Sequence, residues 1–214
     1  MNLFDKPAAT IAPTGRLILV RHGESEGNRD RIFTTSPSIG LTDAGREQAR
    51  AAAERIAAKF KPRIIVSSPY VRAQQTAEII AARLELPIVI EPNLHERRFG
   101  DLRGQPYDAA EVARVFDGAN HWHWRPPGDD SESLEDVRLR VGPALERLAA
   151  ENPLDELVVV SHGAVMLSAW AHLTGSIEGV TITPNCGIVL VEHERGRLGL
   201  PVPIIDTAPV INEE

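Results

Sequence analysis

The chain has 214 residues, a size that fits one α/β domain or two small ones. Its net charge of −7 and its pI near 5.5 argue against a nucleic-acid partner. The single cysteine, Cys186, excludes an internal disulfide and provides no zinc-ligand spacing. No apolar run is long enough to span a bilayer, and residues 1–16 lack the basic start and apolar core of a secretory signal. We therefore expect a cytoplasmic protein without a membrane partner.

The first strong pattern is an apolar run that leads directly into an arginine, a histidine and a glycine. Residues 17–20, Leu-Ile-Leu-Val, predict a strand buried on both faces, as in a parallel sheet. Ligands of open α/β sheets bind beyond the carboxyl ends of the strands. That rule places Arg21 and His22 at a ligand site, where Gly23 allows a tight turn. Taken alone, the motif could equally be a structural histidine beside a surface arginine.

A second copy of this arrangement lies far down the chain. Residues 157–160, Leu-Val-Val-Val, predict another buried strand, which runs into Ser161, His162 and Gly163. A helix is expected over 164–173. Two such strands in one sheet can bring both imidazoles to the same edge, which favours a ligand site over a structural histidine.

Arg72 lies in the first turn of a helix expected over 70–84, directly after a short buried strand. A cation at a helix N-terminus opposes the helix dipole, so Arg72 needs another reason to be there. An ordinary exposed helix charge is the alternative. The other elements expected in this part are a helix that begins at Thr42 or Asp43 and ends at Phe60, and strands over 64–66 and 88–90.

The loop around residues 118–130 concentrates aromatic and basic side chains. We interpret Trp122, Trp124 and Arg125 as a lid or specificity wall over the ligand site, with plain packing as the alternative. His121 and His123 flank Trp122, but no carboxylate or cysteine spacing supports a metal site.

The remaining expectations concern the rest of the chain and its division. Pro143 should kink or break a helix that begins near Ser133 and runs toward Ala150. A helix is expected over 108–116 and a strand over 187–193. The expected division is a flexible leader over 1–15, a single catalytic domain over 16–195 with a lid or specificity insertion over 105–130, and a C-terminal surface tail over 196–214.

Taken in chain order, these motifs resemble the histidine phosphatase superfamily, in its phosphoglycerate-mutase-like branch. The branch of classical acid phosphatases usually follows Arg-His-Gly with an arginine and a proline, which residues 24–28 do not match. The resemblance covers nearly all of residues 16–193 and implies an α/β fold, a three-layer αβα sandwich with a mostly parallel central sheet. The matching segments are Arg21-His22-Gly23-Glu24-Ser25 through Asn28, Leu41-Thr42 through Gly45, Ser67-Ser68-Pro69 through Arg72-Ala73, Gln75-Thr76-Ala77, Glu96 before Phe99-Gly100, and Ser161-His162-Gly163.

The resemblance also implies a mechanism, that of a metal-independent phosphomonoesterase without a cofactor, which works through a phosphohistidine. His22 would take the phosphoryl group, and Glu96 would protonate the leaving oxygen. Neighbouring cations keep a histidine neutral and therefore nucleophilic, and they balance the charge of the transferring phosphoryl group. The site residues are, for catalysis, His22, Glu96, Arg21, Arg72 and His162, and, for substrate binding, Asn28, Ser25, Gly163, Trp122, Trp124 and Arg125.

Three alternatives stay open at this point. Glu96 could serve only in ion pairs with its basic neighbours, and Ser25 could simply cap the loop. True mutases of this branch carry a longer segment after the acid residue, with a lysine and paired arginines for the substrate carboxylate. Residues 104–109 contain no lysine and 118–127 contain one arginine, Arg125, which favours a phosphatase over a mutase. A catalytically silent module that binds a phosphorylated ligand is the remaining possibility, although the complete catalytic set speaks against it. We expect a small phosphorylated metabolite as partner and leave a homodimer open.

Overall fold

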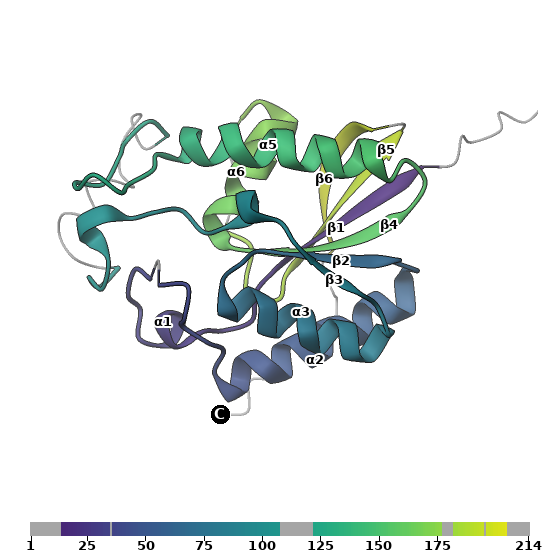
Figure 1. Ribbon diagram of the computed structural model, residues 1–214, viewed down its shortest axis with the longest axis horizontal. Coiled ribbons are helices and arrows are strands. Elements are labelled where there is room, and N and C mark those ends of the chain that lie inside the picture. The colour runs from purple at the N-terminus through teal and green to yellow at the C-terminus, as the bar shows by residue number, and fades with distance from the viewer. Residues whose placement is uncertain (1–13, 35, 108–121, 177–181, 195, 205–214) are drawn as a thin grey trace, which may run out of the picture.

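The computed structural model describes residues 14–34, 36–107, 122–176, 182–194 and 196–204. These residues form a central sheet with helices on both faces (Figure 1). The strands are β1 (Gly15–Arg21), β2 (Ile64–Ser67), β3 (Ile88–Ile90), β4 (Glu156–Ser161), β5 (Ile188–Glu194) and β6 (Arg197–Ile204). The helices are α1 (Glu26–Arg29), α2 (Asp43–Lys59), α3 (Val71–Leu84), α5 (Leu134–Glu151) and α6 (Gly163–Thr174), with short 3-10 turns η1 (Pro92–Leu94) and η2 (Gly100–Leu102).

The sheet is mostly parallel. Its strand order is β3-β2-β4-β1-β5-β6. The pairs β3–β2, β2–β4 and β4–β1 are parallel, whereas β5 runs antiparallel to β1 and β6 antiparallel to β5. Because β2, β4 and β1 are parallel neighbours, their carboxyl ends meet at one edge of the sheet. The predicted three-layer αβα architecture is confirmed.

Strand β1 shows why the apolar run of the sequence is continuous. Alternate side chains of a strand point to opposite faces of the sheet, and helices cover both faces here. Leu17 and Leu19 pack into the core beneath α5 and α6, whereas Ile18 and Val20 pack into the core above α2 and α3. All four side chains are buried. The four central positions of β1 are therefore covered on both faces of the sheet, and none of them offers a solvent-facing place for a polar residue.

The helix that follows the first loop begins as the sequence predicts. Thr42 is the N-cap of α2, and its side chain accepts a hydrogen bond from the backbone N–H of Gly45. Its hydroxyl donates to the Glu24 carboxylate over 2.7 Å. The start of α2 is thereby tied to the loop that follows β1.

The structure contradicts two expectations about the C-terminal half, a helix break at Pro143 and a surface tail over residues 197–204. Helix α5 runs from Leu134 to Glu151 without a break at Pro143. Its buried apolar face packs on the sheet and on α6, and such packing outweighs one lost backbone hydrogen bond. Residues 197–204 are not a surface tail but strand β6, which pairs with β5. The prolines Pro201 and Pro203 are tolerated there because β6 is an edge strand, where a missing N–H needs no second neighbour.

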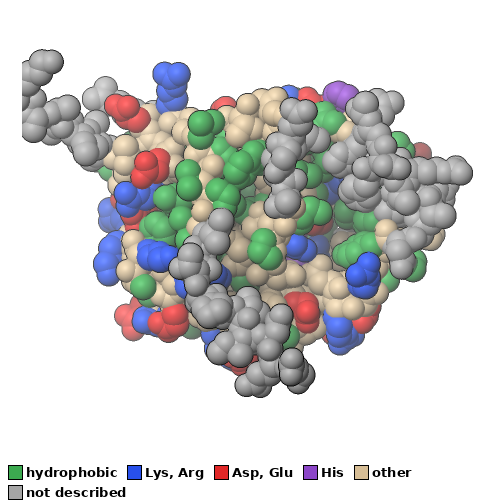
Figure 2. All heavy atoms as spheres, turned by 180° about the vertical axis from the view of Figure 1, so that it is seen from behind, with side chains coloured by type: hydrophobic (Ala, Val, Ile, Leu, Met, Phe, Trp, Pro, Cys, Tyr) green, Lys and Arg blue, Asp and Glu red, His purple; other side chains and the backbone are tan. Residues whose placement is uncertain are grey.

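Some expectations fall outside the described residues. These are the leader up to residue 13, the helix over 108–116 and the chain beyond 204. Within the described residues, no helix is long and apolar enough to cross a membrane. Figure 2 shows basic and acidic side chains interspersed on the face opposite to that of Figure 1, with hydrophobic side chains between them. Among the side chains coloured there, the basic groups do not join into a stripe.

Candidate active site

Three parallel strands deliver the predicted site residues to one edge of the sheet. Strand β1 ends at Arg21, directly before His22, and β4 ends at Ser161, directly before His162. The two strand ends are register partners, because Arg21 pairs with Ser161. The His22 and His162 rings therefore meet edge to face, with their centroids 5.1 Å apart and their planes at 62°. Arg72 arrives from the neighbouring strand β2 through the first turn of α3.

The hydrogen bonds of His22 define its tautomer. Nδ1 lies 2.6 Å from the carbonyl oxygen of Gly23, an acceptor, so Nδ1 must carry the proton. On the other side of the ring, Arg72 Nε donates to His22 Nε2 over 3.3 Å, which requires a lone pair on Nε2. Burial lowers the pKa of His22 well below its usual range, and the charges of Arg72 and Arg21 lower it further. His22 is thus a neutral imidazole with Nε2 as its nucleophilic atom.

His162 is buried beside this nucleophile. Burial and the charge of Arg72 lower its pKa well below the usual value as well. Its Nε2 lies 2.7 Å from the Ser68 hydroxyl. Its Nδ1 is buried and has no hydrogen-bond partner among the described residues. The described residues therefore leave one buried polar atom of His162 unsatisfied, which is rare in proteins.

Arg72 is buried and Arg21 is half-buried. Arg72 is only 2% exposed, so the alternative of an exposed helix charge is wrong. Arg21 Nη1 donates to the Thr183 carbonyl over 2.7 Å, whereas the buried Arg21 Nε has no partner among the described residues. Burial lowers the pKa of both guanidiniums, and the nearby charge of Glu96 opposes that shift. Neither guanidinium has a carboxylate in hydrogen-bond contact among the described residues, so the two cations can bind an anion.

Gly163 lies beside Arg21, at a position where a Cβ atom would make ordinary van der Waals contacts. A Cβ atom at Gly163 would lie 3.6 Å from the Arg21 guanidinium. Gly163 is also the first residue of α6, so the partial positive charge of this helix N-terminus faces the same region.

The loop after β1 positions Asn28. Ser25 and Asn28 form a capping box at the start of α1, in which Asn28 Oδ1 accepts from the Ser25 backbone N–H over 3.1 Å. Asn185 Nδ2 donates to the same oxygen over 3.2 Å and to the His22 carbonyl over 3.0 Å. The capping alternative for Ser25 is therefore observed, although Ser25 also lines the pocket described next.

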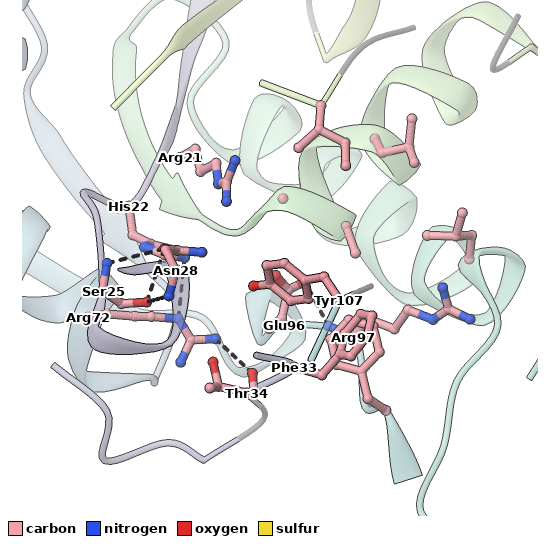
Figure 3. A pocket seen from close by; sticks show the side chains of 16 residues that line it. Arg21, His22, Ser25, Asn28, Phe33, Thr34, Arg72, Glu96, Arg97 and Tyr107 are labelled. Atoms are coloured by element: carbon pink, nitrogen blue, oxygen red, sulfur yellow. Dashed lines mark hydrogen bonds between the residues drawn. The ribbon is translucent and has the colours of Figure 1, made fainter. Parts of the chain in front are cut away.

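These groups surround one pocket of about 420 Å³ (Figure 3). Glu96, which is 9% exposed and follows η1, lies across the pocket from the arginines, and its Oε1 accepts from the Arg97 backbone N–H over 2.8 Å. Arg21, Arg72 and His22 thus converge on the pocket as expected from the sequence, whereas His162 is fully buried against the His22 ring and does not line the pocket. The predicted residues that line the pocket are Arg21, His22, Ser25, Asn28, Arg72, Glu96 and Gly163.

The expected wall of Trp122, Trp124 and Arg125 lies elsewhere. Trp122 Nε1 donates to Glu135 over 2.7 Å, and Arg125 pairs with Asp136 over 2.6 Å. Trp124 packs against the aromatic cluster of Phe33. The structure places none of the three at the pocket, and each is held by a partner whose position the sequence does not reveal.

Two groups at the site escaped the sequence analysis. Asn185 holds the His22 loop, but a lone asparagine in a loop carries no sequence signal. Ser68 contacts His162 and belongs to the matching segment Ser67-Ser68-Pro69, which by itself indicated no role for this hydroxyl. Within the described residues, no group of three or more His, Cys, Asp or Glu side chains is placed to hold a metal ion.

Comparisons with known proteins agree with this geometry. Residues 17–202 match the model of the family described as "Histidine phosphatase superfamily (branch 1)". Phosphoglycerate mutase-like protein 4 of Arabidopsis thaliana is 35% identical over 80% of this chain and 76% of its own length. A 2,3-bisphosphoglycerate-dependent phosphoglycerate mutase of Methylobacterium sp. is 36% identical over 69% of this chain and 74% of its own.

Phosphatases are found among the relatives too. A glucosyl-3-phosphoglycerate phosphatase of Mycolicibacterium vanbaalenii is 34% identical over 75% of this chain and 74% of its own. The solved structure of a mycobacterial glucosyl-3-phosphoglycerate phosphatase superposes with a TM-score of 0.75 at 25% identity, covering 92% of this chain and 100% of the other. From the family match over most of its length and from these relatives, the chain belongs to branch 1 of the histidine phosphatase superfamily.

Proposed function

We propose that this phosphatase is a metal-independent phosphomonoesterase that passes the phosphoryl group of a small metabolite to His22 and then to water. The observation that carries the proposal is the state of the His22 ring. Its Nδ1–H is held by the Gly23 carbonyl, so the Nε2 lone pair lies beside the Arg72 guanidinium in the pocket. A fixed tautomer and a lowered pKa are what a nucleophilic histidine requires.

In the first half-reaction, His22 Nε2 attacks the phosphorus and the ester P–O bond breaks. The leaving oxygen takes a proton from the Glu96 carboxyl group, because an alkoxide is a poor leaving group without one. Arg21 and Arg72 balance the charge on the equatorial phosphoryl oxygens, which leaves no step that needs a metal ion. The unpartnered Arg21 Nε is a donor available to one of those oxygens.

In the second half-reaction, water attacks the phosphohistidine and the P–N bond breaks. The Glu96 carboxylate now accepts a proton from the water, so it returns to the acid form for the next cycle. His22 leaves as a neutral imidazole, inorganic phosphate is released, and the protein is restored.

Radiolabelling tests this proposal. A phosphomonoester labelled in its phosphate should transfer an acid-labile, alkali-stable label to the protein, and phosphate release should persist in excess chelator. The His22→Ala protein should carry no label, and Glu96→Gln should slow the hydrolysis of alkyl esters. Failure of the wild type to acquire label, combined with tight binding of a phosphorylated ligand, would indicate a silent binding module instead.

A mutase activity is the second candidate, favoured by the relatives that are named mutases. The same phosphohistidine could serve it, with a second phosphoglycerate in place of water. The absence of a lysine from residues 104–109 supports the phosphatase. Interconversion of 2- and 3-phosphoglycerate faster than phosphate release would establish the mutase.

A further inference from the structure

The pocket has two chemically different ends. The end described above holds Arg21, Arg72 and His22. Six other side chains that line the pocket form what we call the apolar wall: Phe33, Phe99, Tyr107, Leu134, Leu167 and Ile182. The Tyr107 hydroxyl is the one polar group among these six side chains, and it hydrogen-bonds with Asn28. They belong to the loop after α1, the segments around η2, the starts of α5 and α6, and the segment before β5.

Part of the apolar wall is a packed aromatic cluster. The ring of Phe33 lies with its centroid 4.8 Å from the centroids of both Phe99 and Tyr107. Phe33 itself is buried, whereas Phe99 and Tyr107 are half-buried and Ile182 is 57% exposed. Apolar surface therefore remains open toward the pocket, and a ligand that covers it gains the hydrophobic contribution of that area.

A third arginine of the pocket, Arg97, is held by backbone carbonyls and aromatic rings. Arg97 lines the pocket, but its Nε donates to the Glu132 carbonyl over 2.7 Å and its Nη2 to the Trp124 carbonyl over 2.9 Å. The guanidinium lies over the rings of Phe99 and Trp124. Its side chain extends away from the groups of the phosphate end (Figure 3). Burial lowers the pKa of Arg97 to about 10.

From this composition, and resting on the proposed function, we infer that the substrates are phosphomonoesters of apolar alcohols or phenols, whose alkyl chain or aromatic ring lies on the apolar wall. The described side chains of the wall provide no cation for a carboxylate and few partners for sugar hydroxyls. A charged or polar group placed there would lose its water without compensation. This substrate class differs from the phosphoglycerates for which two of the relatives are named.

A substrate series tests the inference on the wild-type protein. Ethyl, propyl, butyl and pentyl phosphate all release a primary alkoxide, so they make the same demand on Glu96. We expect kcat/KM to rise about fourfold for each methylene that the wall buries. 3-Phosphoglycerate has three carbons, as propyl phosphate does, but its middle carbon carries a hydroxyl and its terminal carbon is the carboxylate. We expect its kcat/KM to be about tenfold lower than that of propyl phosphate.

A pair of variants tests the location. Leu167→Arg places a cation in the wall and should raise kcat/KM for 3-phosphoglycerate relative to propyl phosphate. Leu139→Arg adds the same charge on α5, at a side chain that is 58% exposed and outside the pocket lining, and should leave that ratio unchanged.

The outcomes separate the two proposals. A flat alkyl series, or faster hydrolysis of 3-phosphoglycerate than of propyl phosphate by the wild type, overturns the inference while the phosphatase stands. If no ester in the series is hydrolysed, the proposed function itself fails, and the inference fails with it.

Discussion

Replacing Arg140 with methionine should lower both the stability of the protein and the rate at which Glu96 protonates a leaving group. Arg140 Nε donates to Glu132 Oε1 over 2.9 Å, and Nη2 donates to Oε2 over 3.1 Å. The exposed side-chain fractions are 14% for Arg140 and 4% for Glu132. Burial raises the pKa of Glu132, but the hydrogen bond and charge of Arg140 outweigh that effect, so its pKa lies below the ordinary value.

The stability loss follows from the charge left behind. Removing one partner of a buried ion pair costs about 3–5 kcal/mol. We expect about 3 kcal/mol, the low end of that range, because Glu132 keeps two contacts with Arg98. The Arg98 backbone N–H lies 3.0 Å from Glu132 Oε2, and the Arg98 guanidinium lies 3.5 Å from Oε1. In a chain of this length, that loss corresponds to a decrease in Tm of about 6–12 °C.

The catalytic effect follows from the carbonyls that Arg140 also holds. Its Nη1 donates to the Asn93 carbonyl over 2.6 Å, and its Nη2 to the Glu96 carbonyl over 3.3 Å. The loop that carries Glu96 should therefore shift in Arg140→Met. Because a displacement of about 1 Å can cost about 100-fold in rate, we expect alkyl phosphates to be hydrolysed about 10–100 times more slowly. An aryl ester with an acidic phenol needs no proton on leaving and should be much less affected.

Denaturant unfolding and the ratio of alkyl to aryl hydrolysis measure the two effects separately. Arg138→Met is the matched control, because Arg138 lies on the same helix and pairs with Glu135 at side-chain exposures of 30% and 25%. That partly exposed pair should contribute about 0.5 kcal/mol or less. The reasoning is refuted if Arg140→Met retains the wild-type stability, or if both esters slow by the same factor.

Two further predictions concern pH and backbone space. The lowered pKa values keep His22 and His162 neutral in the folded protein, so below a pH of about 6.5 the unfolded chain binds more protons than the folded chain. The free energy of unfolding should therefore fall by about 1 kcal/mol per histidine between pH 8 and pH 5.5. Equal stability at both pH values would contradict this. In Gly45→Ala, the new Cβ would lie 2.0 Å from the Glu24 carbonyl oxygen, so we expect a loss of about 2–3 kcal/mol and lower phosphatase activity as the loop after β1 moves. Alanine at the exposed Glu47 of the same helix should change neither, and a Gly45→Ala protein as stable and active as wild type would contradict the prediction.

Several features could be predicted from the sequence because each depends on a local pattern. The apolar runs before Arg21 and Ser161 are continuous because helices cover both faces of their strands, which is a property of parallel sheets. Once the strands are parallel neighbours, their carboxyl ends share an edge, so the meeting of His22 and His162 follows from the chain order. Thr42 as an N-cap is local in the same sense.

Other features depend on contacts between segments that are distant in the sequence, and no local pattern indicates them. The edge strand β6 resembles a proline-rich tail until β5 supplies its partner. Trp122 hydrogen-bonds to Glu135 and does not line the pocket. Arg140 hydrogen-bonds to the carbonyl of Glu96, which lies 44 residues earlier in the chain. The apolar wall combines side chains from separate loops and helix starts. Local patterns along the chain thus predict the strands and the residues at their ends. The side chains that contact those residues are seen only in the folded protein, because packing, rather than spacing along the chain, selects side-chain partners.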